Sequence, residues 1–554
     1  MAVSISVGLL SGEKVAVLLT EGSSVDELRK QAQRSLRVSI AQLITASGEV
    51  LQRPATLQEA CIKDGDSLTA VVGQPAVAAA LNAFAAIRAD GSVVAWGGPP
   101  IDEDESGDPG NCTAVQSQLQ RVTHIQAAYC AFAALREDGS VVTWGDDVAG
   151  GDSSSVQDQL YDVCSLQSSM HAFAALKKDG SVVTWGLGLA GDSTSVRGQL
   201  HDVRAIQSDE NHFAALRADG VVVYWGDYAN KVGFEVLDLL RDVLWIQGSL
   251  DGFAAVKAKG KLVFFGVADP DFGDIFPRGE KPGDTLSSVH ETGLPDVCHL
   301  QFCRTCWAAA SQDGKLATFG PVNSTLSSLV ACPAPHTIGD VVGIQSYARY
   351  DLAAFAAIRR DGSVVTWGDG LAGGDSSAVQ NELKNVVQVQ AAGSAFAALR
   401  TDGSVVTWGR SDAGDSRRVQ AQLKNITSIQ TNGAAFAALR ADGSVITWGS
   451  RVEGGDSSLA QGLLQDVTCI QASNAAFAAI RVDGSIVTWG RACAGACSKR
   501  VREELGRTEA DLEVEIWAEA QVEARREAKL AQRTKAGAKP CFGLRVAKRR
   551  KRGG

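Results

Sequence analysis

Four residues in the middle of the chain have the types and the spacing of a metal site. Cys298, His299, Cys303 and Cys306 offer thiolate and imidazole groups, and Cys-x-x-Cys is a common ligand spacing for zinc. The alternative is that they are substitutions within a repeated unit. Cys298 occupies the position of Thr123 and Cys164 in other copies, and Cys306 lies just before the aromatic residue of its copy, near the position of Cys130. The register of the repeat favours this alternative. We therefore expect no metal and no cofactor.

Other catalytic patterns are incomplete or missing. Cys493 and Cys497 have no second pair close in sequence, which weakens a zinc hypothesis there. The acidic stretch "IDEDESGDPGN" at 101–111 hints at calcium, but a calcium loop that begins at Asp102 has Thr113 where Glu is required. No phosphate-binding loop, nucleophile elbow or histidine cluster is present. The sequence therefore predicts a protein that is not an enzyme.

A basic run lies near the end of a chain that is otherwise mildly acidic, with a net charge of −10. Such a run is typical of a nuclear import signal or a patch for acidic partners, and a solvated tail is the alternative. Contact with nucleic acid is possible only through this run. Since no long apolar segment or signal peptide is seen, we expect a cytoplasmic or nuclear protein without a membrane span. The residues are Lys548, Arg549, Arg550, Lys551 and Arg552.

The elements that would position any site belong to a repeat. The stretch "FAALREDGSVVTWG" at 132–145 returns almost unchanged as "FAALKKDGSVVTWG", "FAAIRRDGSVVTWG" and "FAALRTDGSVVTWG", and most copies lie 40 or 41 residues apart. A fixed period of this size indicates a solenoid or a propeller. Ten copies begin at Phe84, Phe132, Phe173, Phe213, Phe253, Trp307, Phe355, Phe396, Phe436 and Phe477.

The sequence pattern of each copy predicts a β-hairpin with two apolar faces. Asp138-Gly139 favours a tight turn, and a loop of two residues would place Ala133 and Trp144 on one face and Phe132 on the other. Because both faces are apolar, we expect each hairpin to lie between two neighbouring sheets. A further short strand precedes each hairpin, as in Val122-x-x-Ile125-Gln126, and a short helix or turn follows in "GGDSSSVQDQL". The recurring Trp is expected to be structural rather than a binding surface.

The pattern of these copies resembles the repeats of the regulator of chromosome condensation family, which build β-propellers. Two departures are present: a Gly-Gln-Leu-Gly-like segment is replaced by "GGDSSSVQDQL", and ten copies exceed the roughly 4–8 blades of one propeller ring. The spacing also reads as a block of five repeats written twice, with eroded copies at the join. Two small rings, one large or open ring, and seven blades plus extras all remain open.

Residues 1–74 have a different pattern and resemble ubiquitin-like domains. The order strand–strand–helix–strand–strand is expected, with Ser24 and Glu27 as the capping pair of the helix. Members of that family bind partners through a small apolar patch, which the resemblance places at Leu10, Ile44 and Val71; ordinary strand packing is the alternative. The family's Gly-Gly is absent at "VVGQPAV", so the resemblance implies a fixed module rather than a transferred tag.

We therefore predict a mainly β protein: a ubiquitin-like β-grasp domain (1–74), a β-propeller-like repeat domain (75–492), a charged helix (493–536) and a basic disordered tail (537–554). The combination is similar to the propeller portion of HECT-type ubiquitin ligases, but no HECT domain fits after Gly490. The expected function is a non-catalytic adaptor or scaffold. Its expected partners are a ubiquitin receptor and a second, unknown protein at the propeller. The alternative is a regulator of a small GTPase, acting in nucleotide exchange or on chromatin.

Overall fold

The computed structural model describes most of residues 2–491. The exceptions are residues 10, 12, 37, 39, 48, 52–54, 74, 98–108, 228–237, 250–251, 268–284, 292–293, 295, 304–305, 320–337, 350–351 and 411–413. Within the described part the chain is mainly β, as predicted. None of the helices described there is both long and apolar enough to cross a membrane.

The N-terminal domain is one four-stranded sheet with one helix. The strands run in the order β2-β1-β4-β3, and β1 and β4 are parallel. Glu27 N–H donates to Ser24 Oγ at 3.1 Å and Ser24 N–H to Glu27 Oε2 at 3.0 Å, so the predicted capping pair is confirmed. The elements are β1 (Ala2–Leu9), β2 (Lys14–Thr20), α1 (Val25–Leu36), β3 (Ile40–Ile44) and β4 (Ser67–Val72).

The repeats form ten antiparallel sheets, each built from consecutive strands. Nine have three strands, and the fifth carries β20 as a fourth. In order they are β5 (Ala76–Ala79), β6 (Ala83–Ile87), β7 (Val93–Gly97); β8 (Val122–Ala127), β9 (Ala131–Arg136), β10 (Val141–Gly145); β11 (Val163–Ser168), β12 (Ala172–Lys177), β13 (Val182–Gly186); β14 (Val203–Ser208), β15 (His212–Arg217), β16 (Val222–Gly226); and β17 (Val243–Gly248), β18 (Phe253–Lys257), β19 (Lys261–Val267), β20 (Thr285–Glu291).

The second five sheets follow the same plan. They are β21 (Val297–Cys303), β22 (Cys306–Ser311), β23 (Leu316–Phe319); β24 (Val341–Arg349), β25 (Leu352–Arg359), β26 (Val364–Gly368); β27 (Val386–Ala392), β28 (Ala395–Arg400), β29 (Val405–Gly409); β30 (Ile426–Thr431), β31 (Ala435–Arg440), β32 (Val445–Gly449); and β33 (Val467–Ala472), β34 (Ala476–Arg481), β35 (Ile486–Gly490). A short helix, α2 (Gly188–Gly191), follows β13, and similar single turns follow other sheets.

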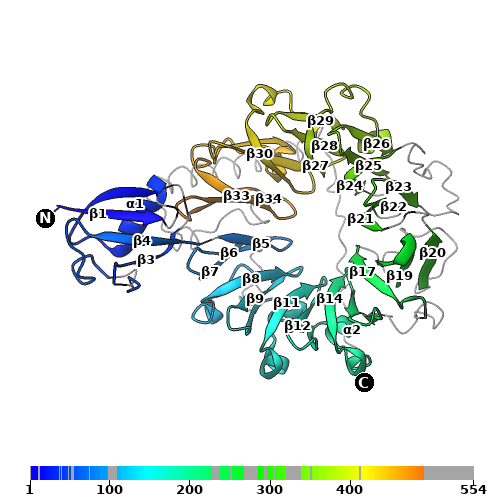
Figure 1. The fold of residues 1–554 in the computed structure, drawn as a ribbon, viewed down its shortest axis with the longest axis horizontal. Helices are drawn as coiled ribbons and strands as arrows, with labels where there is room; N and C mark the ends of the chain where they lie inside the picture. Colours follow the sequence, from blue (N-terminus) through cyan, green and yellow to red (C-terminus); the bar gives the residue numbers. More distant parts are fainter. Residues whose placement is uncertain are drawn as a thin grey trace, which may run out of the picture. The chain divides into compact units, whose positions relative to one another are not determined.

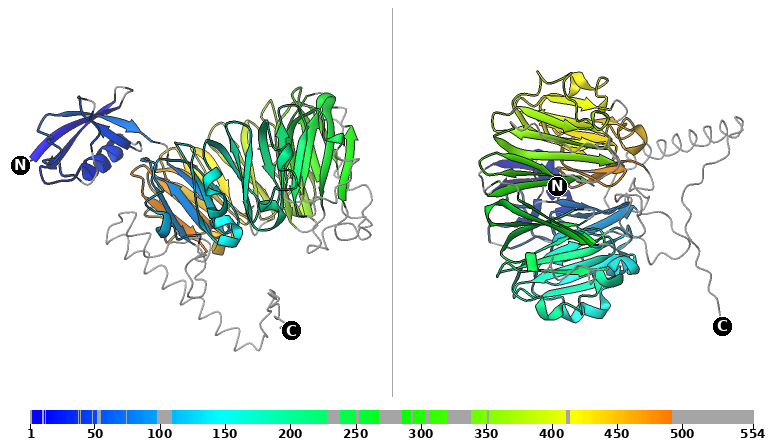
Figure 2. Two further views of the ribbon diagram at one scale, coloured as in Figure 1. Left: turned by 90° about the horizontal axis from the view of Figure 1, so that it is seen from below. Right: turned by 90° about the vertical axis from the view of Figure 1, so that its right-hand side faces the viewer.

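These ten sheets close into a single ring. Each sheet shares one apolar cluster with the sheet before it and another with the sheet after it. The last sheet meets the first, where Ala478 and Ile480 pack with Phe84 and Trp96. Figure 1 shows the sheets in sequence order with β5 beside β33, and Figure 2 shows neighbouring sheets face to face. Of the arrangements that the sequence left open, the ring of ten is therefore the one observed.

The hairpin differs from the prediction in its register. Val141 pairs with Leu135 and Trp144 with Phe132, so Phe132 and Trp144 share one face and stack with ring centroids 5.2 Å apart. The predicted loop of two residues is wrong, because Gly139 alone has a positive φ and Arg136 N–H donates to Ser140 O at 2.9 Å. The loop therefore has three residues, and the extra residue moves Trp144 to the opposite face of its strand.

A polar segment replaces the fourth strand of an ordinary blade. After β10 the chain returns along the outer edge of the sheet, where Gln157 Nε2 donates to Val141 O at 3.1 Å. Ser153 Oγ, which is buried, contacts Thr143 Oγ1 and Gln157 Oε1 at 2.9 Å each. Sheets beginning at β24, β27 and β30 repeat this network. The "GGDSSSVQDQL" motif thus caps a strand edge, which explains its recurrence.

Backbone bonds also join neighbouring sheets at the Asp-Gly turns. Val163 N–H, at the start of β11, donates to Gly139 O in the turn of the preceding sheet at 2.9 Å. Within its own sheet, Lys178 N–H donates to Asp162 O, also at 2.9 Å. Asp162 has a φ of 54°, and a side chain at Gly139 would approach its Cα to 3.0 Å. The Gly is therefore needed both for its positive φ and for the close approach of the next repeat.

Candidate interaction surfaces

The outward face of the N-terminal sheet gathers two of the three predicted binding residues. Ile44 lies opposite Thr69 and Val71 opposite Gln42, so Ile44 and Val71 occupy diagonal positions on the same face of β3 and β4. Both side chains are half-buried. The third predicted residue, Leu10, lies outside the described residues.

The same sheet turns its other face to a closed core. Leu43 and Ala70, which alternate with Ile44 and Val71 along their strands, are buried against α1 and its neighbours. Outward positions carry small or aliphatic residues, including Leu18, which is 69% exposed, and Val50, which bridges to Ile44. Lys14 is the one charge among the outward positions of the described strands. This face has the chemistry of a protein-binding surface rather than a catalytic site.

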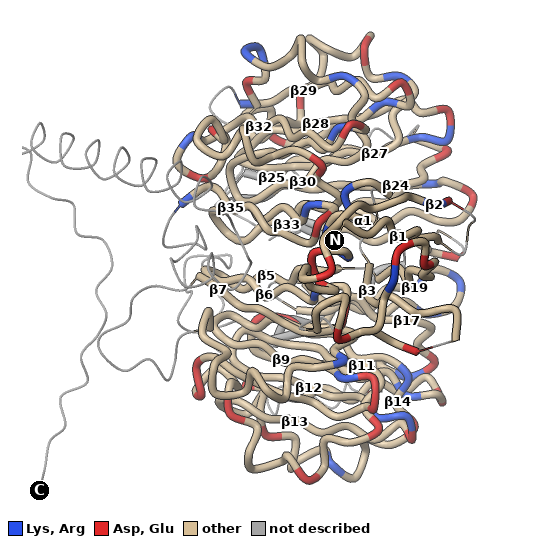
Figure 3. Tube along the Cα trace, turned by 90° about the vertical axis from the view of Figure 1, so that its left-hand side faces the viewer, with Lys and Arg blue, Asp and Glu red and all other residues tan. Residues whose placement is uncertain are grey.

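Most polar side chains described in the ring form hydrogen bonds or ion pairs with other residues of the ring. Asp138 accepts hydrogen bonds from the N–H and the hydroxyl of Ser140 at 3.0 and 2.6 Å. These bonds hold the pKa of the Asp138 carboxyl below its usual range. Arg136 Nε donates to Gln120 O at 3.3 Å. Figure 3 shows that charges gather in turns and connections, while the strands carry few.

The recurring Trp residues join one sheet to the next. Trp185 Nε1 donates to Gly150 O at 3.0 Å, and the Trp408–Gly373 and Trp489–Gly454 pairs repeat this bond at the same distance. Trp185 is 3% exposed. The structural role predicted for the Trp is therefore confirmed at these positions.

One buried polar cluster breaks the pattern and was missed by sequence reasoning. His212 Nδ1 lies 2.9 Å from both carboxylate oxygens of Asp209, and its Nε2 lies 2.5 Å from Asp227 O. Burial opposes the charged form, but the contact with Asp209 raises the pKa of His212 above its ordinary value. The signal in the sequence was the replacement of "AF" by "HF" in this copy and of Thr by Tyr224 after the turn.

A small hollow lies between the last two hairpins. It has a volume of about 260 Å³ and is lined by Thr427, Arg440, Asp442, Asp466 and Val482, among others. Its polar groups already engage one another: Asp442 accepts from Ser444 and pairs with Arg440, and Asp466 O accepts from Val482 N–H. Nothing in this hollow points to a reaction.

The metal hypothesis at Cys298, His299, Cys303 and Cys306 is not tested, because the side chains of Cys303 and Cys306 lie outside the described residues. Among the side chains that are described, no group of three or more from His, Cys, Asp or Glu is placed to hold an ion. Cys298 is exposed, and its thiol points to Ala310 O at 3.6 Å. Cys493, Cys497 and most of the acidic stretch at 101–111 lie outside the described residues, as does the basic run from Lys548 to Arg552.

No protein-family model and no curated protein matches the chain. Solved structures give fold-level similarities of low score. Prp20p from Saccharomyces cerevisiae is 16% identical over 53% of this chain and 82% of that chain, with a TM-score of 0.29. A chain in the structure of Kap60 bound to yeast RCC1 (Prp20) is 14% identical over 78% and 92%, with a TM-score of 0.32.

The N-terminal part is similar to the N-terminal ubiquitin-like domain of the 4931431F19Rik protein. The two are 25% identical over 13% of this chain and 76% of that chain, with a TM-score of 0.12. The chain thus has structural neighbours among propellers of the regulator of chromosome condensation type and among ubiquitin-like domains. At these scores the similarity assigns neither a family nor a binding partner to this chain.

Proposed function

We propose that this protein is a non-catalytic scaffold of the ubiquitin system. Its N-terminal domain docks a ubiquitin-receptor type of partner through Ile44, Val71 and Leu10, and the ring presents a second partner-binding surface. The observation that supports the proposal is the placement of Ile44 and Val71 together, half-exposed, on the outward face of the sheet, where Lys14 is the one charge among the described strand positions. The basic run from Lys548 to Arg552 serves import or an acidic partner, in the cytoplasm or the nucleus.

A direct binding experiment tests the proposal. A fluorescein-labelled ubiquitin-interacting helix is titrated with the full chain and with Ile44→Ala and Val71→Ala variants. We expect each substitution to weaken binding about tenfold, because truncating a central apolar contact removes about 1–2 kcal/mol. Val387→Ala, which truncates an exposed residue of the ring, is the control and leaves binding unchanged. Equal binding by the wild type and both variants would refute the docking face.

The alternative function is regulation of a small GTPase. The full chain and the Ile44→Ala variant also distinguish it from the scaffold proposal. Prp20p, whose structure is similar at a low score, has binding properties to Gsp1p and histones. If the full chain accelerates nucleotide release from a small GTPase while the Ile44→Ala variant does so equally well, the ring acts on a GTPase and the scaffold proposal fails.

A further inference from the structure

The two ends of the ring differ in chemistry. We call the end where each third strand finishes at Trp-Gly the Trp-Gly end; the turns between first and second strands lie there too. The opposite end carries the Asp-Gly turns, where Arg and Asp pair within one turn, as Arg440 and Asp442 do. At the Trp-Gly end, the loops of three successive sheets, β8–β10, β11–β13 and β14–β16, combine acidic residues with exposed apolar side chains.

The described residues of these loops contain carboxylates and neither Lys nor Arg, and Lys231, further along the connection after β16, lies outside the described residues. The described residues 127–131, 145–153, 168–172, 186–193, 208–211 and 226–227 include no Lys or Arg. Their acidic residues are Asp146, Asp147, Asp152, Asp192, Asp209, Glu210 and Asp227. Burial lowers the pKa of His171, so this imidazole is neutral at pH 7 and does not offset them.

The same loops expose large apolar side chains. Val148 is 57% exposed, Leu187 50%, Leu189 51% and Tyr129 38%. Such residues gathered beside carboxylates differ from the scattered single apolar residues of an ordinary surface. We call the set the acidic crescent; it consists of Tyr129, Asp146, Asp147, Val148, Leu187, Leu189, Glu210 and Asp227.

The loops of the crescent are connected to one another. Leu189 N–H donates to Asp227 Oδ1 at 3.0 Å, which joins the second loop to the third. Trp185 Nε1 donates to Gly150 O, which joins the first to the second. Tyr129 packs edge-on against His171 with ring centroids 5.7 Å apart. The crescent is therefore held in place before any partner arrives, which lowers the entropic cost of binding.

A buried Tyr hydroxyl near Asp227 has no hydrogen-bond partner among the described residues. It belongs to Tyr224, whose side chain is 6% exposed. The ring of Tyr224 stacks on His212 at 5.3 Å, and His212 in turn contacts Asp227 O.

We infer that the acidic crescent binds a short cationic amphipathic segment of a partner protein, in which Lys or Arg alternates with Leu, Ile, Val or Met. The carboxylates attract the cationic side chains, and Val148, Leu187 and Leu189 contact the apolar ones. The inference rests on the proposed scaffold function in one respect: it identifies the second surface of that scaffold and its kind of partner.

The far side of the ring offers a matched control. Val452 holds the position of Val148 and Leu189 in its own loop and is 61% exposed, but Arg451 flanks it and Arg491 pairs with Glu453 beside it. Figure 3 shows acidic segments near β9, β12 and β13 and basic ones near β32 and β35. A cationic segment should therefore bind beside Val148 and Leu189 but not at the corresponding loop that carries Val452.

The test is fluorescence polarisation with the full chain and a short labelled peptide rich in Lys and Leu. We expect Leu189→Ser and Val148→Ser each to weaken binding about tenfold and Val452→Ser to leave it unchanged. The double variant Asp146→Asn and Asp147→Asn should weaken binding about fivefold at low salt and less at high salt, since these charges are screened. Asn retains an oxygen for the bond from Val148 N–H, so the loop stays folded.

Two results would overturn the inference: equal weakening by Val452→Ser and Leu189→Ser, or equal binding of a peptide in which Glu replaces Lys. Ile44→Ala serves as a further control. It leaves the cationic peptide bound, so failure of the crescent and failure of the N-terminal docking face are distinguishable.

Discussion

The indole N–H of Trp185 donates to the carbonyl oxygen of Gly150 at 3.0 Å and so ties one sheet of the ring to the sheet before it. A side chain at Gly150 would also come within 2.8 Å of Phe173, the stacking partner of Trp185. Each loop thus closes over the aromatic pair of the next repeat. The stability of a repeat resides in these contacts with its neighbours, and the polar groups that could do chemistry are largely used to make them.

Gly150→Ala tests this contact. Gly150 has a φ of 91°, so Ala is strained there and clashes with Phe173. We expect a loss of about 2 kcal/mol in the free energy of unfolding, measured by urea denaturation. Gly198→Ala is the matched control, since a side chain there meets nothing within 4 Å. Equal stability of the two variants would contradict the proposed packing.

Trp185→Phe separates the hydrogen bond from the ring stack. Phe retains an aromatic face for Phe173 but loses the N–H donor and part of the buried area, so we expect a loss of about 1–3 kcal/mol. The measurement is the same denaturation, with exposed Tyr161→Phe as the control. A variant as stable as the wild type would show that the Trp–Gly bond does not contribute.

Acid should weaken the Asp-Gly turns. In the turn Asp402-Gly403, the bonds from Ser404 hold the pKa of Asp402 below its usual range. In the outer segment after β29, the bonds from Arg417 lower the pKa of Asp415 to about 2. A lowered pKa contributes stability that is complete above the unfolded value of about 4 and is lost as the pH falls through the folded value. Asp402→Asn should therefore reduce the loss of thermal stability as the pH falls below about 4. An unchanged acid profile in this variant would refute the role of the turn.

The stability contributed by the Asp209–His212 pair should be lost as the pH rises, in contrast to that of the Asp-Gly turns. Because the pKa of His212 is raised, its contribution is present below about pH 6.5 and is lost as the pH rises through the folded value. The double variant Asp209→Ser and His212→Ala copies the residues of the preceding repeat, Ser169 and Ala172, and should remove this alkaline loss. The measurement is the melting temperature between pH 6 and pH 9, and a persisting loss would contradict the assignment.

An isolated repeat should not fold. A peptide covering 122–162 contains the β8–β10 sheet and its edge segment, but neither neighbouring sheet. Both faces of its hairpin would lie in water, and a lone small sheet is marginal there. We expect circular dichroism without a cooperative thermal transition, in contrast to the full chain. Cooperative unfolding of the peptide would show that neighbours are not required.

The sequence predicted the repeat, its three strands and the structural role of Trp, because period, turn residues and apolar runs are local signals. It placed Phe132 and Trp144 on opposite faces of the hairpin, because Asp-Gly alone does not set the loop length. One extra residue in the turn shifts the pairing by one residue, which moves every side chain of the strand to the other face. Ring closure between Phe84 and Ile480 depends on the rotation between sheets, which no residue pattern reports. The Asp209–His212 pair arises from two substitutions in one copy and had no repeated signal.

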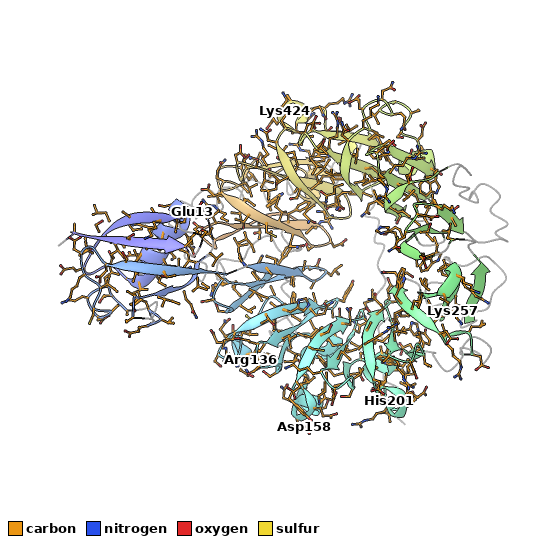
Figure 4. The ribbon with its side chains drawn as sticks, in the orientation of Figure 1. Glu13, Arg136, Asp158, His201, Lys257 and Lys424 are labelled. Carbon is orange, nitrogen blue, oxygen red and sulfur yellow. The ribbon has the colours of Figure 1, made fainter. Side chains whose placement is uncertain are left out.

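The candidate face of the N-terminal domain could be predicted because alternation along a strand assigns residues to one side. Ile44 and Val71 lie outward as the resemblance implied, whereas Leu43 and Ala70 form the core. The domain boundaries and the roles of these residues stay predictions. The acidic crescent escaped sequence reasoning, since its carboxylates come from loops that are far apart along the chain and meet only through the ring. Figure 4 shows Asp158 and His201 of the outer segments at the perimeter of the ring.

Electron microscopy of the full chain tests the central claim most directly. Two-dimensional class averages viewed along the ring axis count the radial sheets. The account predicts one closed ring with ten of them, the first beside the last. Two separate rings, an open arc, or a ring with fewer sheets and a projecting remainder would contradict it.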